Sequence, residues 1–306
     1  MKKILLGIFI GLIWNCVDAG AQVKNAELEG LLSRHLRSIG PEAVLAGVKT
    51  RVAEGTSHYK VVMGGPTGTV DLDGKAALVS EGQQVRMLLR FSDPRYPGEN
   101  YVTDGKKVQV YNLPRSGFGE LVYNEEPLMR DGLLGGVLTT AWPFFSQDRR
   151  RAKLTYAGLA EIDGKKLHEI KYQPQKRSDL KISFYFDPDT SRHVLSIYTV
   201  ELAPKMLGTD FNRMLQQAET NPLAPPPIET NSQSQPDMAN SRQQTIRFRL
   251  EERFSEFRDQ NGLTLPIAWN IRLTMEGYQS TIVSWDVKFE RLEFNLTLDP
   301  RNFSMK

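Results

Sequence analysis

The sequence contains almost no cysteine. The one cysteine among its 306 residues is Cys16, which lies inside an apolar run close to the N-terminus. The rest of the chain therefore has no disulfide, no thiol nucleophile and no thiolate ligand for a zinc site. A chain of this length can bury enough apolar surface to fold on its core alone.

A strong net charge is also missing. Lys and Arg number 39 and Asp and Glu number 36, which gives a formal net charge of +3. So balanced a chain offers no support for nucleic-acid binding. After residue 21, no stretch approaches the ~20 apolar residues that a membrane-spanning helix needs.

The N-terminus has the pattern of a secretory signal peptide. Met1-Lys2-Lys3 is a basic start, Ile4–Val17 is a short apolar run, and Ala19-Gly20-Ala21 has the small residues of a cleavage site. We therefore expect a signal peptide over residues 1–21, cleavage after Ala21 and a bacterial periplasmic location. An uncleaved anchor helix is the alternative, but the apolar run is short for a span. Lipid attachment at Cys16 is disfavoured by the bulky residues before it.

Residues 26–39 carry apolar side chains at helical spacing, which predicts an amphipathic helix. Gly40-Pro41 ends this helix and permits a second short one from Glu42 to about Val48. The apolar face of the first helix consists of Leu28, Leu31, Leu32, His35, Leu36 and Ile39.

Most of the remaining chain alternates apolar and polar residues, which is typical of antiparallel strands with one covered face. We predict ten or eleven strands in one strongly bent sheet. The apolar sets are Val85, Met87, Leu89 and Phe91; Leu180, Ile182, Phe184 and Phe186; Ile246, Phe248 and Leu250; Trp269, Ile271, Leu273 and Met275; and Trp285, Val287 and Phe289.

Polar dipeptides between these runs predict hairpin turns, because they supply the positive φ angles that tight turns need. They are Asp73-Gly74, Asp104-Gly105, Asp163-Gly164 and Asn261-Gly262. A further turn is expected at 187–190, where Pro188 occupies the second position.

Two segments interrupt the alternation. Residues 124–151 have a mostly helical apolar spacing between Pro127 and Pro143, so we predict a helix over Leu128–Trp142. Residues 221–241 are rich in Pro, Asn, Ser and Gln and predict a flexible loop. This loop could separate two domains. We favour a single domain over residues 22–306, because the strand patterns on both sides have the same character.

The combined pattern resembles the LolA/LolB-like superfamily, the outer-membrane lipoprotein carriers of the periplasm and their relatives. The stretches that carry the resemblance are Asp104-Gly105-Lys106 with the following strand, Leu133–Trp142, Tyr156–Tyr172 and Leu180–Val200. The resemblance implies a mainly β (α+β) fold: one strongly curved antiparallel sheet, a half-open β-barrel of about 10–11 strands capped by helices. This chain differs from the carriers in its greater length and its Pro-rich loop.

The resemblance also implies an apolar cavity for a lipid or lipoprotein acyl chain, beneath a helical lid at about 124–151. Gly135-Gly136 would weaken the lid helix by about 1 kcal/mol per glycine, which would let it move aside. The alternative is that this segment completes the core and leaves no cavity. The candidate ligand-binding residues are Met87, Leu89, Phe91, Leu133, Leu134, Val137, Leu138, Trp142, Ile182 and Phe184.

No catalytic signature is present. The histidines His35, His58, His168 and His193 lack the spacing of metal ligands, and the chain has no G-x-S-x-G nucleophile motif. We expect His35 to be a core residue and His193 to be hydrogen-bonded in a turn. The resemblance names no catalytic residue, since the carriers are not enzymes. We therefore expect no enzyme, no metal and no cofactor.

The expected protein is a monomeric, non-catalytic lipid- or acyl-chain-binding carrier of the periplasm. An interaction or sensing module for an envelope protein partner, using the same fold without a lipid, is one alternative. A hydrolase with its active site in the concave groove is the other. Arg149-Arg150-Arg151 could touch a membrane surface transiently, although a solvated loop is the simpler interpretation.

Overall fold

The computed structural model describes residues 15–63, 69–94, 96–111, 115–145, 152–176, 178–203, 207, 245–277 and 280–304, with only the backbone for 15–24, 62, 63 and 69. The start of the predicted signal peptide, the three consecutive arginines at 149–151 and the Pro-rich stretch at 221–241 lie outside these residues. Cleavage after Ala21 and the role of the Pro-rich stretch stay predictions.

Twelve strands form one antiparallel sheet, in the order β5-β4-β3-β2-β1-β12-β11-β10-β9-β8-β7-β6. The predicted fold class is confirmed: the sheet does not close, because β5 and β6 lie at its two edges and do not pair with each other. It has one or two more strands than expected. The strands are β1 (Thr50–Met63), β2 (Thr69–Glu81), β3 (Gln84–Phe91), β4 (Gly98–Thr103), β5 (Val108–Val110), β6 (Lys153–Ile162), β7 (Lys165–Gln173), β8 (Lys181–Phe186), β9 (His193–Leu202), β10 (Ile246–Gln260), β11 (Leu263–Glu276) and β12 (Thr281–Phe294).

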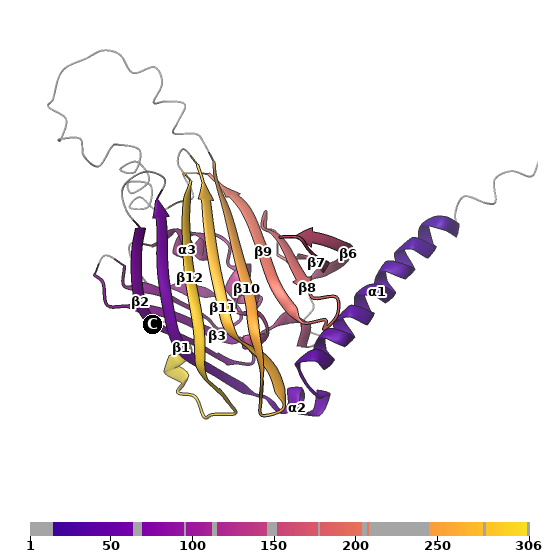
Figure 1. Cartoon of the computed structure of the whole chain (residues 1–306), viewed down its shortest axis with the longest axis horizontal. Coiled ribbons are helices and arrows are strands. Elements are labelled where there is room, and N and C mark those ends of the chain that lie inside the picture. The colour runs from indigo at the N-terminus through magenta and orange to yellow at the C-terminus, as the bar shows by residue number, and fades with distance from the viewer. Residues whose placement is uncertain are drawn as a thin grey trace, which may run out of the picture.

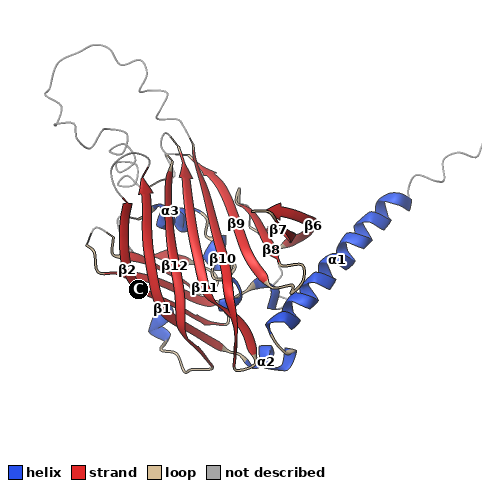
Figure 2. Cartoon of the chain, viewed as in Figure 1, coloured by secondary structure: helices blue, strands red, loops and turns tan. Residues whose placement is uncertain are grey.

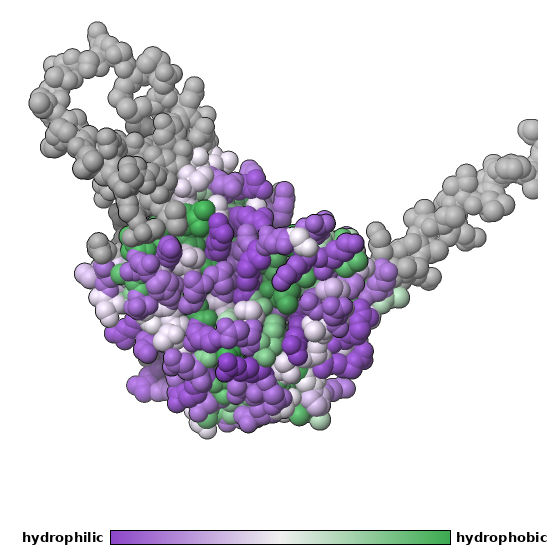
Figure 3. Space-filling model, in the orientation of Figure 1, coloured by the Kyte–Doolittle hydropathy of each residue, from purple (hydrophilic) through white to green (hydrophobic). Residues whose placement is uncertain are grey.

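The sheet is bent so that one face turns inward. Figure 1 shows β1 and β9–β12 in front, with β3 and α3 behind them. All members of the five predicted apolar sets are buried, which confirms the alternation. The outward side visible in Figure 3 is mostly hydrophilic, with apolar residues in short strips. The alternation therefore decides which way most strands face. On β7, β8 and β9 a second, smaller buried cluster also forms, consisting of Leu167, Tyr185, Leu195 and Ile197.

The hairpin turns predicted at Asp104-Gly105, Asp163-Gly164 and Asn261-Gly262 are confirmed. Asp163 and Gly164 both have positive φ angles, 51° and 74°, as do Asn261 and Gly262, 54° and 82°. The turn at 187–190 is also present, with the backbone N–H of Thr190 donating to Asp187 Oδ1 at 2.8 Å.

The turn predicted at Asp73-Gly74 is wrong, because both residues lie inside β2. Gly74 pairs with Ser57 of β1 and with Phe91 of β3. A Cβ atom on Gly74 would come within 2.5 Å of the Phe91 ring. This glycine therefore permits a close approach between strands, and the chain reverses later, at Gly82, which has a φ of 56°.

Two helices precede the sheet, α1 (Asn15–Ile39) and α2 (Glu42–Gly47), as Figure 2 shows. The apolar face predicted for residues 26–39 packs onto the core: Leu28, Leu31, Leu32, His35 and Ile39 are buried and Leu36 is partly buried. The helix begins before the predicted Ala26, at Asn15. None of the helices in the described part of the chain is both long and apolar enough to cross a membrane.

Residues 115–145, here called the inner segment, lie inside the bend of the sheet. They form α3 (Gly117–Asn124), α4 (Pro127–Arg130) and the 3-10 turns η1 (Gly136–Leu138) and η2 (Pro143–Phe145). A last 3-10 turn, η5, covers Pro300–Phe303. The continuous helix predicted over Leu128–Trp142 is wrong, because Gly135 and Gly136 have positive φ angles of 78° and 48°, which interrupt a helix.

Candidate functional site

The ten candidate ligand-binding residues come together in one place. Their exposed fractions range from 0 to 5%, and all belong to a single core cluster in which the inner segment packs against the sheet. They are Met87, Leu89 and Phe91 from β3, Ile182 and Phe184 from β8, and Leu133, Leu134, Val137, Leu138 and Trp142 from the inner segment. The inner segment thus occupies the bend of the sheet. That these side chains contact a ligand stays a prediction.

A buried carboxylate anchors the inner segment to the sheet. Glu252 of β10 is fully buried and accepts hydrogen bonds from the backbone N–H of Gly135 (2.8 Å), the Tyr198 hydroxyl (2.7 Å) and Trp269 Nε1 (3.0 Å). Burial raises the pKa of Glu252 to about 7, although these three donors favour the ionised form. Every donor is well placed, so Glu252 fixes where the segment begins its turn at Gly135.

A second anchor is made by two buried histidines. Trp142 Nε1 donates to His35 Nε2 at 3.2 Å, and His35 Nδ1 lies 3.1 Å from the carbonyl oxygen of Ser191. His35 is therefore neutral, with its proton on Nδ1, and burial lowers its pKa to about 4. The His193 ring stacks on Trp142 at 4.7 Å, and burial lowers the pKa of His193 well below its usual value. Glycine is favoured at position 136, because its φ is 48° and a Cβ atom would lie only 3.0 Å from His193 Nδ1.

A pocket opens beside this filled interior, at the end of the sheet covered by α1 and α2. We call it the mouth pocket; its volume is about 1070 Å³. Its lining residues are Glu29, Ser33, Leu36, Arg37, Gly40, Pro41, Glu42, Leu45, Ala46, Val48, Lys49, Arg51, Glu81, Gly82, Thr140 and Phe145. None of the ten candidate residues is among them. The pocket nevertheless adjoins the inner segment, which contributes Thr140 and Phe145.

The wall of the mouth pocket has an apolar part. Leu36 of α1, Leu45 of α2, Val48 and Phe145 are partly buried and pack against the main core. They continue the apolar interior out to the pocket, so an apolar ligand placed there would touch both the helices and the inner segment.

The deepest charged group of the pocket is Arg51 of β1, which is only 3% exposed. Its guanidinium donates from Nη1 to the carbonyl oxygen of Val137 and lies over the Phe145 ring, 4.7 Å from its centroid. Its Nε is buried without a hydrogen-bond partner. Burial alone lowers the pKa of Arg51 to about 9, and no carboxylate among the described residues pairs with it.

Arg51 was not among the candidate residues, although the sequence holds a weak signal for it. Arg51 lies on the same inward face of β1 as four buried residues, Ala53, Ser57, Tyr59 and Val61. An arginine in phase with buried residues is unusual, because such a group is costly to bury unpaired. Gly55 and Ser57 also occupy this face but are not large apolar residues. The alternation of β1 is therefore weak, and its buried face is difficult to recognise from the sequence.

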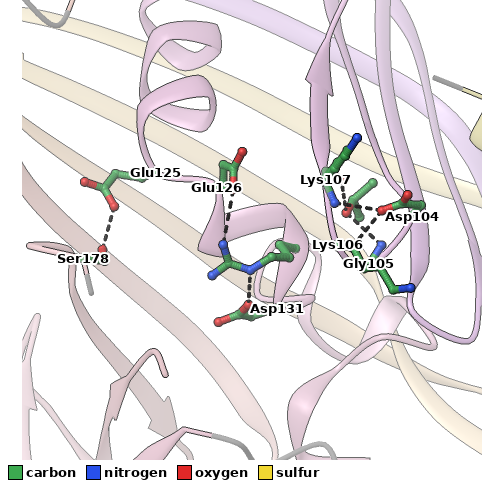
Figure 4. Close-up of polar contacts among 10 residues, drawn as sticks. Asp104, Gly105, Lys106, Lys107, Glu125, Glu126, Asp131 and Ser178 are labelled. Carbon is green, nitrogen blue, oxygen red and sulfur yellow. Dashed lines mark hydrogen bonds and ion pairs between the residues drawn. The ribbon is translucent and has the colours of Figure 1, made fainter. Parts of the chain in front are cut away.

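A third polar group lies at the other end of the inner segment. Figure 4 shows Ser178 beside Glu125, whose carboxylate accepts a hydrogen bond from the Ser178 hydroxyl at 2.6 Å. The same figure shows an arginine side chain between Glu126 and Asp131. This arginine is Arg130, with Nη1 3.3 Å from Glu126 and Nε 3.0 Å from Asp131. Arg130, Glu126 and Asp131 are therefore paired with one another within and beside α4. Figure 4 also shows the turn at Asp104, which accepts from two backbone N–H groups.

A serine and a histidine meet in the interior, but they do not form a catalytic triad. Ser196 Oγ lies 3.0 Å from His193 Nε2, and both residues are buried. His193 Nδ1 has no hydrogen-bond partner, whereas a triad needs a carboxylate there. His193 was predicted to bond within the turn at 187–190; it lies instead under the inner segment. The described residues contain no cluster of three potential metal ligands.

No protein-family model matches the chain, and no curated protein matches it. Solved structures match along most of its length. A LolA superfamily protein from Nitrosomonas europaea is 10% identical, covers 90% of this chain and 96% of its own, and has a TM-score of 0.42. A putative outer membrane lipoprotein-sorting protein domain from Vibrio parahaemolyticus is 10% identical, with 90% and 94% covered and a TM-score of 0.42.

A third match is the MucA/MucB complex of Pseudomonas aeruginosa, 12% identical, with 88% of this chain and 99% of that chain covered and a TM-score of 0.21. The LolA superfamily, which the sequence pattern resembles, is therefore named among the matching structures. At TM-scores this low, the matches decide nothing about a ligand or a partner of this chain.

Proposed function

We propose that this protein is a non-catalytic periplasmic carrier that binds the apolar chain of a lipid or lipoprotein in the mouth pocket. The observation that carries the proposal is the apolar wall of Leu36, Leu45, Val48 and Phe145 in a pocket of about 1070 Å³. This volume slightly exceeds the roughly 300–1,000 Å³ of small-molecule sites. Each methylene buried there would contribute about 0.8 kcal/mol to binding.

In this proposal, the ten candidate residues would contact the ligand only after it has entered the mouth pocket. Five of them belong to the inner segment and five to the sheet against which it packs, and Glu252 and His35 hold this segment in place. A chain longer than the mouth pocket would reach them only if the inner segment moved. The proposal therefore places first contact at Phe145 and Thr140, the two residues of that segment that line the pocket.

Chain length provides the test. Hexyl, octyl, decyl and dodecyl glucosides share one uncharged headgroup, and their affinities can be measured by displacement of a fluorescent apolar probe. We expect each added methylene to tighten binding about threefold to fourfold until the pocket is full. Leu45→Gln should weaken the binding of decyl glucoside at least tenfold. Affinities that do not rise with chain length would contradict the proposal.

Leu159→Gln is the matched control, because Leu159 is 57% exposed on the edge strand β6 and is not part of the pocket. It should leave the affinity unchanged. Equal losses in both variants, or no binding by the wild type, would shift support to the alternative of a protein-interaction module. Mass spectrometry of protein purified gently from the periplasm would then show no co-purified lipid.

A further inference from the structure

The mouth pocket contains a positive charge that the fold leaves incompletely partnered. Among the described residues, six charged side chains line it, and five of them are exposed to water: Arg37, Lys49, Glu29, Glu42 and Glu81. Arg51 is the sixth and is buried. The exposed charges are solvated and screened, whereas the field of a buried charge is not. The deep end of the pocket is therefore cationic, although the six described charged side chains balance in formal charge.

The hydrogen bonds of Arg51 are also incomplete. A guanidinium has five N–H donors in a planar fork. One of them reaches the carbonyl oxygen of Val137, and the Nε donor has no partner. Leaving a buried donor unsatisfied costs free energy, and a buried charge without a counter-ion costs more. An anion at the base of the pocket would supply the missing counter-charge.

We propose that the mouth pocket selects amphiphiles that carry an anionic headgroup, a carboxylate or a phosphate monoester, and that Arg51 binds this headgroup. The inference rests on the proposed function, because it concerns the polar end of the same ligand. The fork of Arg51 matches the two oxygens of a carboxylate or of a phosphate. The neighbouring Leu36, Leu45 and Val48 provide the apolar wall for the attached chain.

Headgroup exchange on a constant chain tests this inference with the wild-type protein. Decanoate, decyl phosphate and decanol would be compared in the same displacement assay at a pH where both acids are ionised. Charge-assisted hydrogen bonds predict that at least one anion binds about tenfold to 100-fold more tightly than decanol. The two anionic arms decide between a carboxylate and a phosphate monoester as the headgroup.

Substitutions then assign the effect to Arg51. Arg51→Met should abolish the preference for the anions and leave the affinity for decanol within about threefold of wild type. Arg51→Lys keeps the charge without the fork, so part of the preference should remain. Arg37→Met is the matched control, because Arg37 lines the same pocket but is exposed and donates to Ser33; it should keep most of the preference.

The outcomes separate the two proposals. Equal affinities of the wild type for decanoate, decyl phosphate and decanol would overturn the headgroup inference and leave chain binding standing. A loss of decanol binding in Arg51→Met as large as the loss of decanoate binding would also overturn it, because Arg51 would then act only through Val137. Failure of all the decyl compounds to bind would overturn the proposed function itself.

Discussion

The interior of the sheet and the mouth pocket each bury an ionisable side chain, but the two side chains differ in how completely they are hydrogen-bonded. In the interior, Glu252 is surrounded by three donors, one from the inner segment and two from the sheet. In the mouth pocket, Arg51 has one carbonyl acceptor, one aromatic ring and an unsatisfied Nε. The first arrangement is complete without a ligand, and the second is not. We infer that the fold requires Glu252, whereas the cost of burying Arg51 is retained for binding.

The largest expected effect comes from breaking the complete arrangement. Glu252→Ala removes the common acceptor of Gly135, Tyr198 and Trp269. The Tyr198 hydroxyl can still donate to the carbonyl oxygen of Leu133 at 3.0 Å, whereas the buried donors of Gly135 and Trp269 lose their acceptor, at a cost of about 1–3 kcal/mol each. We expect the free energy of unfolding, measured by urea denaturation, to fall by about 3–6 kcal/mol.

Glu252→Gln is the control for this substitution. Its amide oxygen can still accept from Gly135 and Trp269, and the Tyr198 hydroxyl can rotate to accept from the amide nitrogen. The loss should therefore be about 1 kcal/mol. Equal losses in the free energy of unfolding for Glu252→Ala and Glu252→Gln would show that the hydrogen bonds to Glu252 do not hold the inner segment in place.

Acid should weaken the same region through His35. The folded-state pKa of His35 is about 4, below its ordinary value of 6.5. Between these two values the unfolded chain binds more protons, so the contribution of His35 falls as the pH falls from 6.5 to 4. Full loss amounts to on the order of 3 kcal/mol. The measurement is urea denaturation across this pH range, for the wild type and for His35→Gln.

His35→Gln isolates this contribution, since glutamine can accept from Trp142 and donate to Ser191 without titrating. Glu252 acts in the opposite direction: its folded-state pKa of about 7 exceeds its ordinary 4.5, so its contribution grows as the pH falls between these values. Glu252 is present in both proteins and cancels in their difference. Curves that stay parallel from pH 7 to 4 would show that the burial of His35 is not maintained in solution.

The interior could be predicted from the sequence to a large extent, because it depends on periodicity. The alternation from Val85 to Phe91 and the helical spacing from Leu28 to Ile39 each identified a buried face. These patterns depend only on residues close together in the sequence, and both the strand and the helix bury the face that the pattern indicates. The turn at Asp163-Gly164 was predictable for the same reason, since its two positive φ angles need only these two residue types.

Features that depend on distant neighbours were not predictable. Asp73-Gly74 has the composition of a turn, but Gly74 is selected by the Phe91 ring across the sheet. The apolar spacing of Leu128–Trp142 is helical, yet Gly135 and Gly136 interrupt the helix with positive φ angles. Gly136 lies close to His193, a residue distant in the chain. The mouth pocket was missed because α1, α2, β1 and the inner segment meet there only after folding.

The smallest stability effect is expected at Arg51, although it is a buried charge. Arg51→Met removes the hydrogen bond to Val137 and the contact with Phe145, which lowers stability. It also removes an unpaired charge from the interior, which raises stability. The two effects oppose each other, so the free energy of unfolding should change by less than about 1 kcal/mol. Lys49→Met, at an exposed position of the same pocket, provides the baseline for urea denaturation. A loss at Arg51 as large as that of Glu252→Ala would place both residues in the same structural role and remove the contrast between the mouth pocket and the interior.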